Sequence, residues 1–159
     1  MKLGADGTVA ETVDVADEAG SPLRGLLDDV GYFGSAFAAL GDVNGDSRRD
    51  FFVGAPGDGN QLNAAQGKGF VLTVGGASVV LASPSPLPAG NVSSSVKIAN
   101  GLGGVPLGQF PFLAQFGEDV GMLEDLDADG VPEAVARQNN PQALYVMFLK
   151  RDGTVRRYQ

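Results

Sequence analysis

The sequence predicts an all-β fold of antiparallel strands, and three observations lead to this prediction. Apolar residues alternate with polar ones in short runs, which is the period of a half-buried strand. The 159 residues include 24 glycines and 9 prolines, a composition that favours many short segments joined by tight turns. The chain also repeats itself, and each copy of the repeat places a polar turn directly before an apolar run.

The expected strands can be followed in chain order. The alternating residues lie at 9–15, 37–39, 51–55, 70–74 and 144–148. Glycine-containing turns of the kind that hairpins need bound them, at residues 6–7, 57–60, 75–76, 103–104 and 152–153. Prolines remove strand hydrogen-bond donors between Ser83 and Asn91, and three serines follow at 93–95, so we expect a long surface excursion there.

Composition excludes several classes of function. Eleven basic residues stand against 19 acidic ones, for a net charge of −8, which argues against binding to nucleic-acid phosphates or anionic lipid and favours cations as partners. Cysteine and histidine are absent, which excludes disulfides, thiolate zinc sites, cysteine nucleophiles and Ser-His-Asp triads. No apolar run approaches the length of a membrane span, and the first residues lack the apolar stretch of a signal peptide, so we expect no membrane insertion.

An internal repeat with an offset of 83 residues divides the chain. Phe33-Gly34 recurs as Phe116-Gly117, and a series of acidic and polar residues recurs with it. The series is Asp42, Asn44, Asp46 and Asp50 in the first copy and Asp125, Asp127, Asp129 and Glu133 in the second. Residues 3–9 and 149–155 also share Leu, Asp, Gly, Thr and Val at equal positions. We therefore expect an end-of-repeat hairpin at residues 1–32, a first repeat at 33–110 and a second repeat at 111–159.

The two acidic series have the spacing of calcium loops. Oxygen side chains fall at positions 1, 3, 5 and 9 of residues 42–50 and 125–133, and the main-chain carbonyls of Arg48 and Val131 stand at position 7. Calcium takes six to eight hard oxygen ligands, which such a loop can supply. The alternative is that these are solvated acidic turns. Because carboxylates held this close repel one another without a cation, two copies in register favour two Ca²⁺ sites.

An EF-hand is the competing kind of calcium loop, and the sequence argues against it. An EF-hand needs a bidentate glutamate at position 12 and helices on both sides. Position 12 is Val53 in the first loop and Ala136 in the second, and apolar residues with the period of strands flank both loops. Each loop is therefore expected to join two strands.

Taken together, Phe33-Gly34, the loop at 42–50 and the following Gly54-Ala55-Pro56 resemble the FG-GAP repeat of integrin α-subunit β-propellers and their bacterial relatives. The resemblance implies a four-stranded antiparallel blade per repeat, with calcium between its first two strands and the Asp-Gly-Thr-Val turn between its last two. It thus implies two propeller blades plus an extra N-terminal hairpin. It also implies an extracellular or cell-surface location.

The second copy departs from this pattern. Arg137-Gln138-Asn139 stands in place of Gly-Ala-Pro, and Glu133 stands in place of the ninth aspartate. The first copy departs once, at Ser47, where glycine is usual after the third ligand. None of these changes removes an oxygen ligand.

Several further residues have two interpretations each. Phe33 and Phe116 are expected in the core between blades rather than as ligand-stacking aromatics. Residues 110–112 fit either a recognition surface or a loop folded under a neighbouring blade. Arg156, Arg157 and Tyr158 fit a solvated outer strand better than an anion site.

Three functions remain open. The first is a calcium-stabilised binding or adhesion scaffold that meets a protein or glycan. The second is a self-assembling subunit of a ring, filament or surface layer, whose partners are other blades, from further copies or from a larger propeller. The third is an enzyme that uses the paired acids Glu118 and Asp119, or Asp28 and Asp29, for glycoside cleavage. Adjacent acids on a strand point to opposite faces, so we expect no enzyme.

Overall fold

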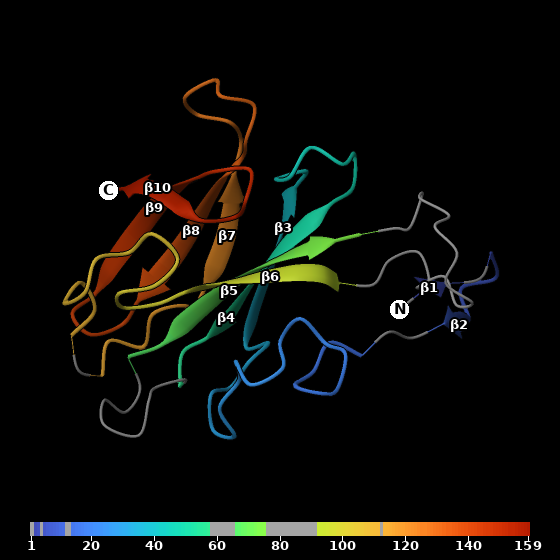
Figure 1. Ribbon diagram of the computed structural model, residues 1–159, viewed down its shortest axis with the longest axis horizontal. Coiled ribbons are helices and arrows are strands. Elements are labelled where there is room, and N and C mark those ends of the chain that lie inside the picture. Colours follow the sequence, from blue (N-terminus) through green and yellow to red (C-terminus); the bar gives the residue numbers. More distant parts are fainter. Residues whose placement is uncertain (1, 4, 12–13, 58–65, 76–91, 112) are drawn as a thin grey trace.

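The computed structural model describes residues 2–3, 5–11, 14–57, 66–75, 92–111 and 113–159. Within these ranges no residue lies in a helix, which confirms the all-β prediction. The strands are β1 (Lys2–Leu3), β2 (Val9–Glu11), β3 (Ala36–Gly41), β4 (Asp50–Ala55), β5 (Lys68–Val74), β6 (Val92–Ile98), β7 (Val120–Leu123), β8 (Glu133–Gln138), β9 (Ala143–Leu149) and β10 (Val155–Tyr158) (Figure 1).

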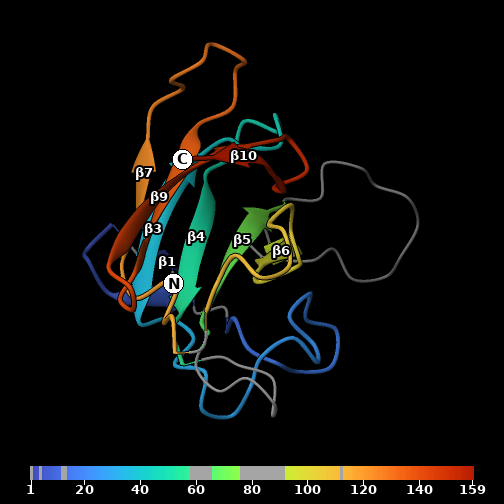
Figure 2. The ribbon, with the colours of Figure 1, turned by 90° about the vertical axis from the view of Figure 1, so that its left-hand side faces the viewer.

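The strands form two four-stranded antiparallel sheets and a separate hairpin. The first sheet has the order β3-β4-β5-β6 and the second the order β7-β8-β9-β10, so each strand pairs with the next one in the chain. The short pair β1-β2 stands alone. Such meanders are consistent with propeller blades. Figures 1 and 2 show the two sheets side by side, with β3 next to β7.

The two sheets share their register as well as their order. Three successive Cα pairs, from Phe37–Val53 to Ala39–Phe51, recur in β7 and β8 at the offset of 83 residues; beside the loop, β3 has a register shift that β7 lacks. Before these strands, the Gly34 N–H donates to the Gly54 carbonyl at 3.0 Å, and the Gly117 N–H donates to the Arg137 carbonyl at 2.9 Å. The repeat in the sequence is therefore a repeat of backbone structure.

The N-terminal hairpin repeats the last hairpin of the chain, as the sequence predicts. Leu3 pairs with Val9 in β1-β2, and Leu149 pairs with Val155 in β9-β10, at the same separation. β2 ends at Glu11, so the alternation that predicts a strand as far as Val15 is only partly realised; residues 12–13 lie outside the described ranges.

The turns of these two hairpins have identical hydrogen bonds. Thr8 donates its N–H and its hydroxyl to Asp6 Oδ1 at 3.1 and 2.7 Å, and Thr154 donates in the same way to Asp152 Oδ1 at 2.9 and 2.6 Å. The hydroxyl bond from the threonine lowers the pKa of each aspartate. The glycine between them has a φ of 82° in the first turn and 81° in the second, a conformation that glycine adopts without strain.

The second sheet docks on the first through Phe116 and Gly117. The Phe116 ring is fully buried and stacks on Phe110 with centroids 4.2 Å apart, which confirms the core interpretation of Phe116 and assigns Phe110 to the core. The Phe116 main chain forms a parallel bridge with Gly67. A Cβ added at Gly54 would lie 1.9 Å from the Gly117 carbonyl oxygen. Glycine at 54 therefore allows the close approach of the two backbones.

The main hydrophobic core lies around this joint. Phe52 and Val71 contribute to it from the first sheet, and Ala134 and Met147 from the second, and all four are buried. Tyr145 packs edge-on against the Phe116 ring. Burial of this apolar surface is the main term that holds the two sheets together.

Residues 14–33 lie over the opposite face of the first sheet, where Leu23 is fully buried. Side chains of the sheet fix this segment at three points. The Lys97 ammonium donates to a carbonyl of the segment at 2.8 Å, the Ser95 hydroxyl to another at 2.7 Å, and Lys68 pairs with Asp28 at 3.1 Å. The rest of this face is an open apolar groove of about 560 Å³.

One expected loop is partly a strand. Residues 93–95, predicted as surface excursion, belong to β6, where the Ser93 and Ser94 hydroxyls lie 3.1 and 2.6 Å from Thr73 Oγ1. Serine fits the strand because a neighbouring strand satisfies its hydroxyl. The proline-containing stretch at 83–91, the turn residues 58–60 and 76, and Phe112 lie outside the described ranges.

Candidate metal centre

Both acidic loops lie where the sequence predicts, between the first two strands of a sheet. Residues 42–49 join β3 to β4, and residues 124–132 join β7 to β8. The two loops project from the same end of the two sheets (Figures 1 and 2). They are neighbours in space because β3 lies against β7.

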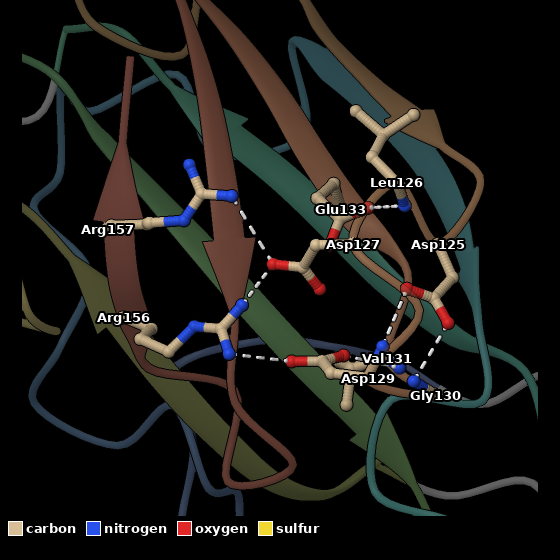
Figure 3. Close-up of polar contacts among 9 residues, drawn as sticks. All are labelled: Asp125, Leu126, Asp127, Asp129, Gly130, Val131, Glu133, Arg156 and Arg157. Carbon is tan, nitrogen blue, oxygen red and sulfur yellow. Dashed lines mark hydrogen bonds and ion pairs between the residues drawn. The ribbon is translucent and has the colours of Figure 1, made fainter.

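The second loop gathers its four carboxylates. One oxygen from each of Asp125, Asp127, Asp129 and Glu133 lies within 4.8 Å of the others. Backbone amides inside the loop hold Asp125, whose Oδ1 accepts the Asp129 N–H at 3.1 Å and whose Oδ2 accepts the Gly130 N–H at 2.8 Å (Figure 3). These bonds wrap the chain around the carboxylates.

Glu133 is the deepest member of this cluster and has one oxygen to spare. The residue is fully buried at the start of β8, and its Oε2 accepts the Leu126 N–H at 2.6 Å. Its Oε1 is buried and accepts no hydrogen bond from the described residues. Burial raises the pKa of the Glu133 carboxyl, and the nearby aspartates act in the same direction. A buried carboxylate oxygen without a partner is costly, and a divalent cation would satisfy it.

The first loop has the same turn, but its side-chain oxygens accept a different set of hydrogen bonds. Asp42 accepts the Gly45, Asp46 and Ser47 amides at 2.7 to 2.9 Å. The Asn44 amide nitrogen donates to Asp46 Oδ2 at 3.2 Å. Among the described residues, the carboxylates of this loop do not gather as those of the second loop do. The predicted ligand residues are present in the first loop, but their carboxylates lie farther apart than those of the second loop.

Asp50 occupies the ninth position of the first loop and is fully buried. Its Oδ2 accepts the Val43 N–H and its Oδ1 the Val74 N–H, both at 2.9 Å. Burial raises the pKa of this carboxyl, while these backbone bonds lower it. Asp50 thus fastens the loop to the end of β5 in addition to any role as a ligand.

The seventh position is fixed in both loops by the preceding aspartate. The Arg48 N–H donates to Asp46 Oδ1, and the Val131 N–H donates to Asp129 Oδ1, each at 2.9 Å. That the carbonyls of Arg48 and Val131 bind a metal stays a prediction.

Two positions in each loop have left-handed backbone. They are Gly45 and Ser47 in the first loop, with φ of 84° and 65°, and Ala128 and Gly130 in the second, with φ of 59° and 81°. These are equivalent positions at the offset of 83 residues, and each loop has glycine at only one of them. A residue other than glycine is strained in this conformation, so Ser47 in the first loop and Ala128 in the second both carry backbone strain.

Two arginines of β10 contact the second loop, which the sequence analysis missed. Arg156 pairs with Asp127 through one nitrogen and with Asp129 through the other, and Arg157 also pairs with Asp127 (Figure 3). β10 is the outer strand of its sheet and both arginines are exposed, as predicted, but the ion pairs with the loop were not predicted. Tyr158 is half-buried: its hydroxyl donates to Gln109 at 2.7 Å and its ring packs on the core.

A third arginine lies between the two loops. A Cβ added at Gly45 would meet Arg151 Nη1 at 2.7 Å, and one added at Gly130 would meet Arg151 Nη2 at 3.1 Å. The β9-β10 turn therefore places positive charge beside both loops.

Three of the four acids considered for catalysis are engaged in ion pairs. Arg137 binds Glu118 and Asp119 with one nitrogen each, at 3.0 and 2.7 Å. Both acids reach the same guanidinium because they lie in a bend before β7, so the expectation that they point to opposite faces is wrong. Asp28 of the other pair binds Lys68.

Comparison with known families supports the repeat interpretation. Residues 33–73 match the FG-GAP repeat, which is a propeller repeat and a structural or binding module rather than an enzyme fold. The match includes the first acidic loop, strands β3 and β4, and all but the last residue of β5. A search of curated proteins gave no match to the chain. None of the described residues belongs to a helix long and apolar enough to span a membrane.

Proposed function

We propose that this chain is a calcium-binding β-propeller module that acts as a binding or adhesion scaffold. The observation that carries the proposal is the second loop, where four carboxylate oxygens converge and the buried Glu133 Oε1 has no partner. Calcium prefers hard oxygen ligands such as these and tolerates irregular geometry. Asp125, Asp127, Asp129 and Glu133 would hold the ion, with the carbonyl of Val131.

A second calcium in the first loop is part of the proposal. Asp42, Asn44, Asp46 and Asp50 would hold it, with the carbonyl of Arg48. The support is the shared turn, with the same left-handed positions and the same backbone bonds at position 7. Occupancy here requires the Asn44 side chain to present its oxygen to the ion.

Calcium has a structural role in this proposal. An ion in each loop would neutralise the carboxylates and fasten the first two strands of each sheet, which leaves the remaining surface to meet a protein or glycan. FG-GAP proteins are typically extracellular, where millimolar calcium saturates loops of modest affinity. We place this chain outside the cell or at its surface on that basis.

Calcium titration of the chelator-treated protein tests the proposal. Calorimetry should report two ions bound by the unmodified chain and one by either Asp46→Ala or Asp129→Ala. Calcium should raise the melting temperature, because an ion that binds only the folded state stabilises it. Asp14→Ala, an exposed acid outside the loops, is the control and should leave both sites intact. A chain that binds no calcium and melts at the same temperature with and without it would contradict the proposal.

The alternative function, a self-assembling structural subunit, has one observation in its favour. The apolar groove of the first sheet is lined by Phe33, Phe51 and Val53, among others. The equivalent residues of the second sheet are Phe116, Ala134 and Ala136, all buried near the joint. The groove thus corresponds to the face that the second sheet buries against the first. A further blade packed on the groove would complete a second joint of this kind.

Native mass spectrometry with calcium and after chelation separates the two functions. A ring or filament of copies would favour the structural subunit. A monomer would favour the scaffold.

A further inference from the structure

Arg156 bridges two of the four carboxylates that the second loop offers to a metal. Its Nη1 lies 3.1 Å from Asp129 Oδ2, and its Nη2 pairs with Asp127 Oδ2 (Figure 3). Arg157 adds a contact to the same Asp127 oxygen at 3.3 Å, and its guanidinium lies over the Phe148 ring. Two guanidinium groups thus neutralise half of the formal charge of the cluster.

Comparison with the first sheet shows that the arginines accompany the more acidic of the two loops. Thr73 of β5 is equivalent to Phe148 of β9, because the residues before them pair with the equivalent residues Phe51 and Ala134. Thr73 pairs with Ser94 and Phe148 with Arg157, so Ser94 is equivalent to Arg157. The residue before it is Ser93 in the first sheet and Arg156 in the second. The fourth strand thus carries two serines in one sheet and two arginines in the other.

The loops differ at the position that the arginines contact. Asp127 of the second loop is Asn44 in the first. In the first loop the Asn44 amide itself donates to Asp46. In the second loop Arg156 donates to Asp129, the equivalent of Asp46. The arginines therefore supply the hydrogen bond and the positive charge that a fourth carboxylate makes necessary.

We propose that Arg156, supported by Arg157, is a built-in counter-cation of the second loop that holds its carboxylates together at low calcium and competes with the ion when calcium binds. This inference rests on the proposed calcium site. Asp127 and Asp129 cannot neutralise the arginine and the ion fully at the same time, and the two cations repel each other. Arg156 therefore weakens calcium binding while it keeps the free loop folded.

The consequence is a loop that is formed before the metal arrives. Without the arginines, the calcium-free loop would be destabilised by repulsion among its carboxylates, and the charge of the divalent ion itself would gather them. With the arginines present, calcium binding to the loop also affects β10, because Arg156 belongs to that strand. Calcium would loosen the contact between β10 and the loop.

Arg156→Gln tests the competition directly. In an Asp42→Ala background, which silences the first loop, we expect the second site of the Arg156→Gln variant to bind calcium about fivefold tighter, from the Coulomb repulsion that is removed. The same variant should melt at a lower temperature in chelator. The control is Arg24→Gln, which removes an exposed arginine of the segment 14–33 and should change neither quantity.

Unchanged or weaker calcium binding by Arg156→Gln would overturn the proposal, since a positioning or purely structural role predicts no gain in affinity. A second measurement avoids reliance on a variant that fails to fold. In the unmodified chain, the side-chain N–H resonance of Arg156 should shift as the second site fills, and a resonance that stays in place at saturation would overturn the proposal. If the unmodified chain binds no calcium, the calcium site itself fails instead.

Discussion

Asp50 and Glu133 occupy the same position in their loops, yet Asp50 uses both carboxylate oxygens on backbone amides and Glu133 uses only one. Both are fully buried at the start of the second strand of their sheets. The first carboxylate ties three parts of the backbone together. The second keeps an oxygen free within a cluster of acids.

This difference predicts opposite sensitivity to amide substitution. In chelator, Asp50→Asn should lower the free energy of unfolding by about 1–3 kcal/mol, because one backbone N–H would face an NH₂ group and lose its acceptor. Glu133→Gln should cost little, because the NH₂ group can take the place of the unpartnered Oε1 while Leu126 keeps its bond. Urea unfolding in chelator measures both, and equal losses would show that the two carboxylates do not differ in this way.

The second loop should bind calcium more tightly than the first. Its four carboxylate oxygens are already gathered, whereas Asp50 is engaged with two amides and Asn44 turns an N–H toward Asp46. Asp125→Ala should therefore remove the tighter of the two binding steps, and Asp42→Ala the weaker one. Calorimetric titration of both variants checks the order, which is refuted if the tighter step survives in Asp125→Ala.

Ser47→Gly should stabilise the first loop. A left-handed residue other than glycine costs about 1–2 kcal/mol. Glycine removes this strain but loses more backbone entropy on folding, so the net gain in stability should be at most about 1 kcal/mol. The melting temperature should rise by about 2–4 °C. Ala128→Gly should act alike in the second loop. Gly130→Ala should act in the opposite direction, and a loss of stability in Ser47→Gly would contradict the reasoning.

Gly54→Ala should weaken the joint between the sheets. The added methyl would lie 1.9 Å from the Gly117 carbonyl oxygen, so the backbones must move apart at a cost of about 1–3 kcal/mol or more. Gly121→Ala is the matched control, because a Cβ there would meet no atom within 4 Å. Thermal unfolding of the two variants should separate them, and a Gly54→Ala variant as stable as Gly121→Ala would argue against this joint.

Thr154→Val should raise the pKa of Asp152 toward its ordinary value, because the hydroxyl hydrogen bond holds it down. The depressed pKa means that this turn contributes stability above the ordinary aspartate pKa and loses it as the pH falls through the lowered one. Carbon NMR titration of the carboxyl measures the shift. Thr8→Val should move the pKa of Asp6 in the same direction, since both hairpins share the turn; different responses would contradict their equivalence.

Much of the fold follows from the sequence because its signals are local and occur twice. Alternating residues and glycine turns predict the strands, and the fixed offset predicts that the two acidic loops occupy equivalent places. The Asp-Gly-Thr-Val stretches predict the end hairpins, since the aspartate and threonine bond within the turn itself. Local chemistry that repeats can be recognised from one sequence.

The features that the sequence did not predict depend on contacts between distant residues. Arg156 meets Asp127 only because β10 returns to the loop after β7, across 29 residues of chain. The serines of β6 are in a strand because Thr73 lies opposite them. Comparison of the fourth strands, serines in one and arginines in the other, would have been the available signal for the arginine contact.

The joint between the sheets distinguishes the docking faces of the two repeats. Gly54 receives the carbonyl of Gly117, but the equivalent position in the second sheet is Arg137, whose guanidinium is held by Glu118 and Asp119. The two repeats have the same backbone and different docking faces. The same approach at Arg137 would bring a backbone against an arginine side chain, so the two docking faces are not interchangeable.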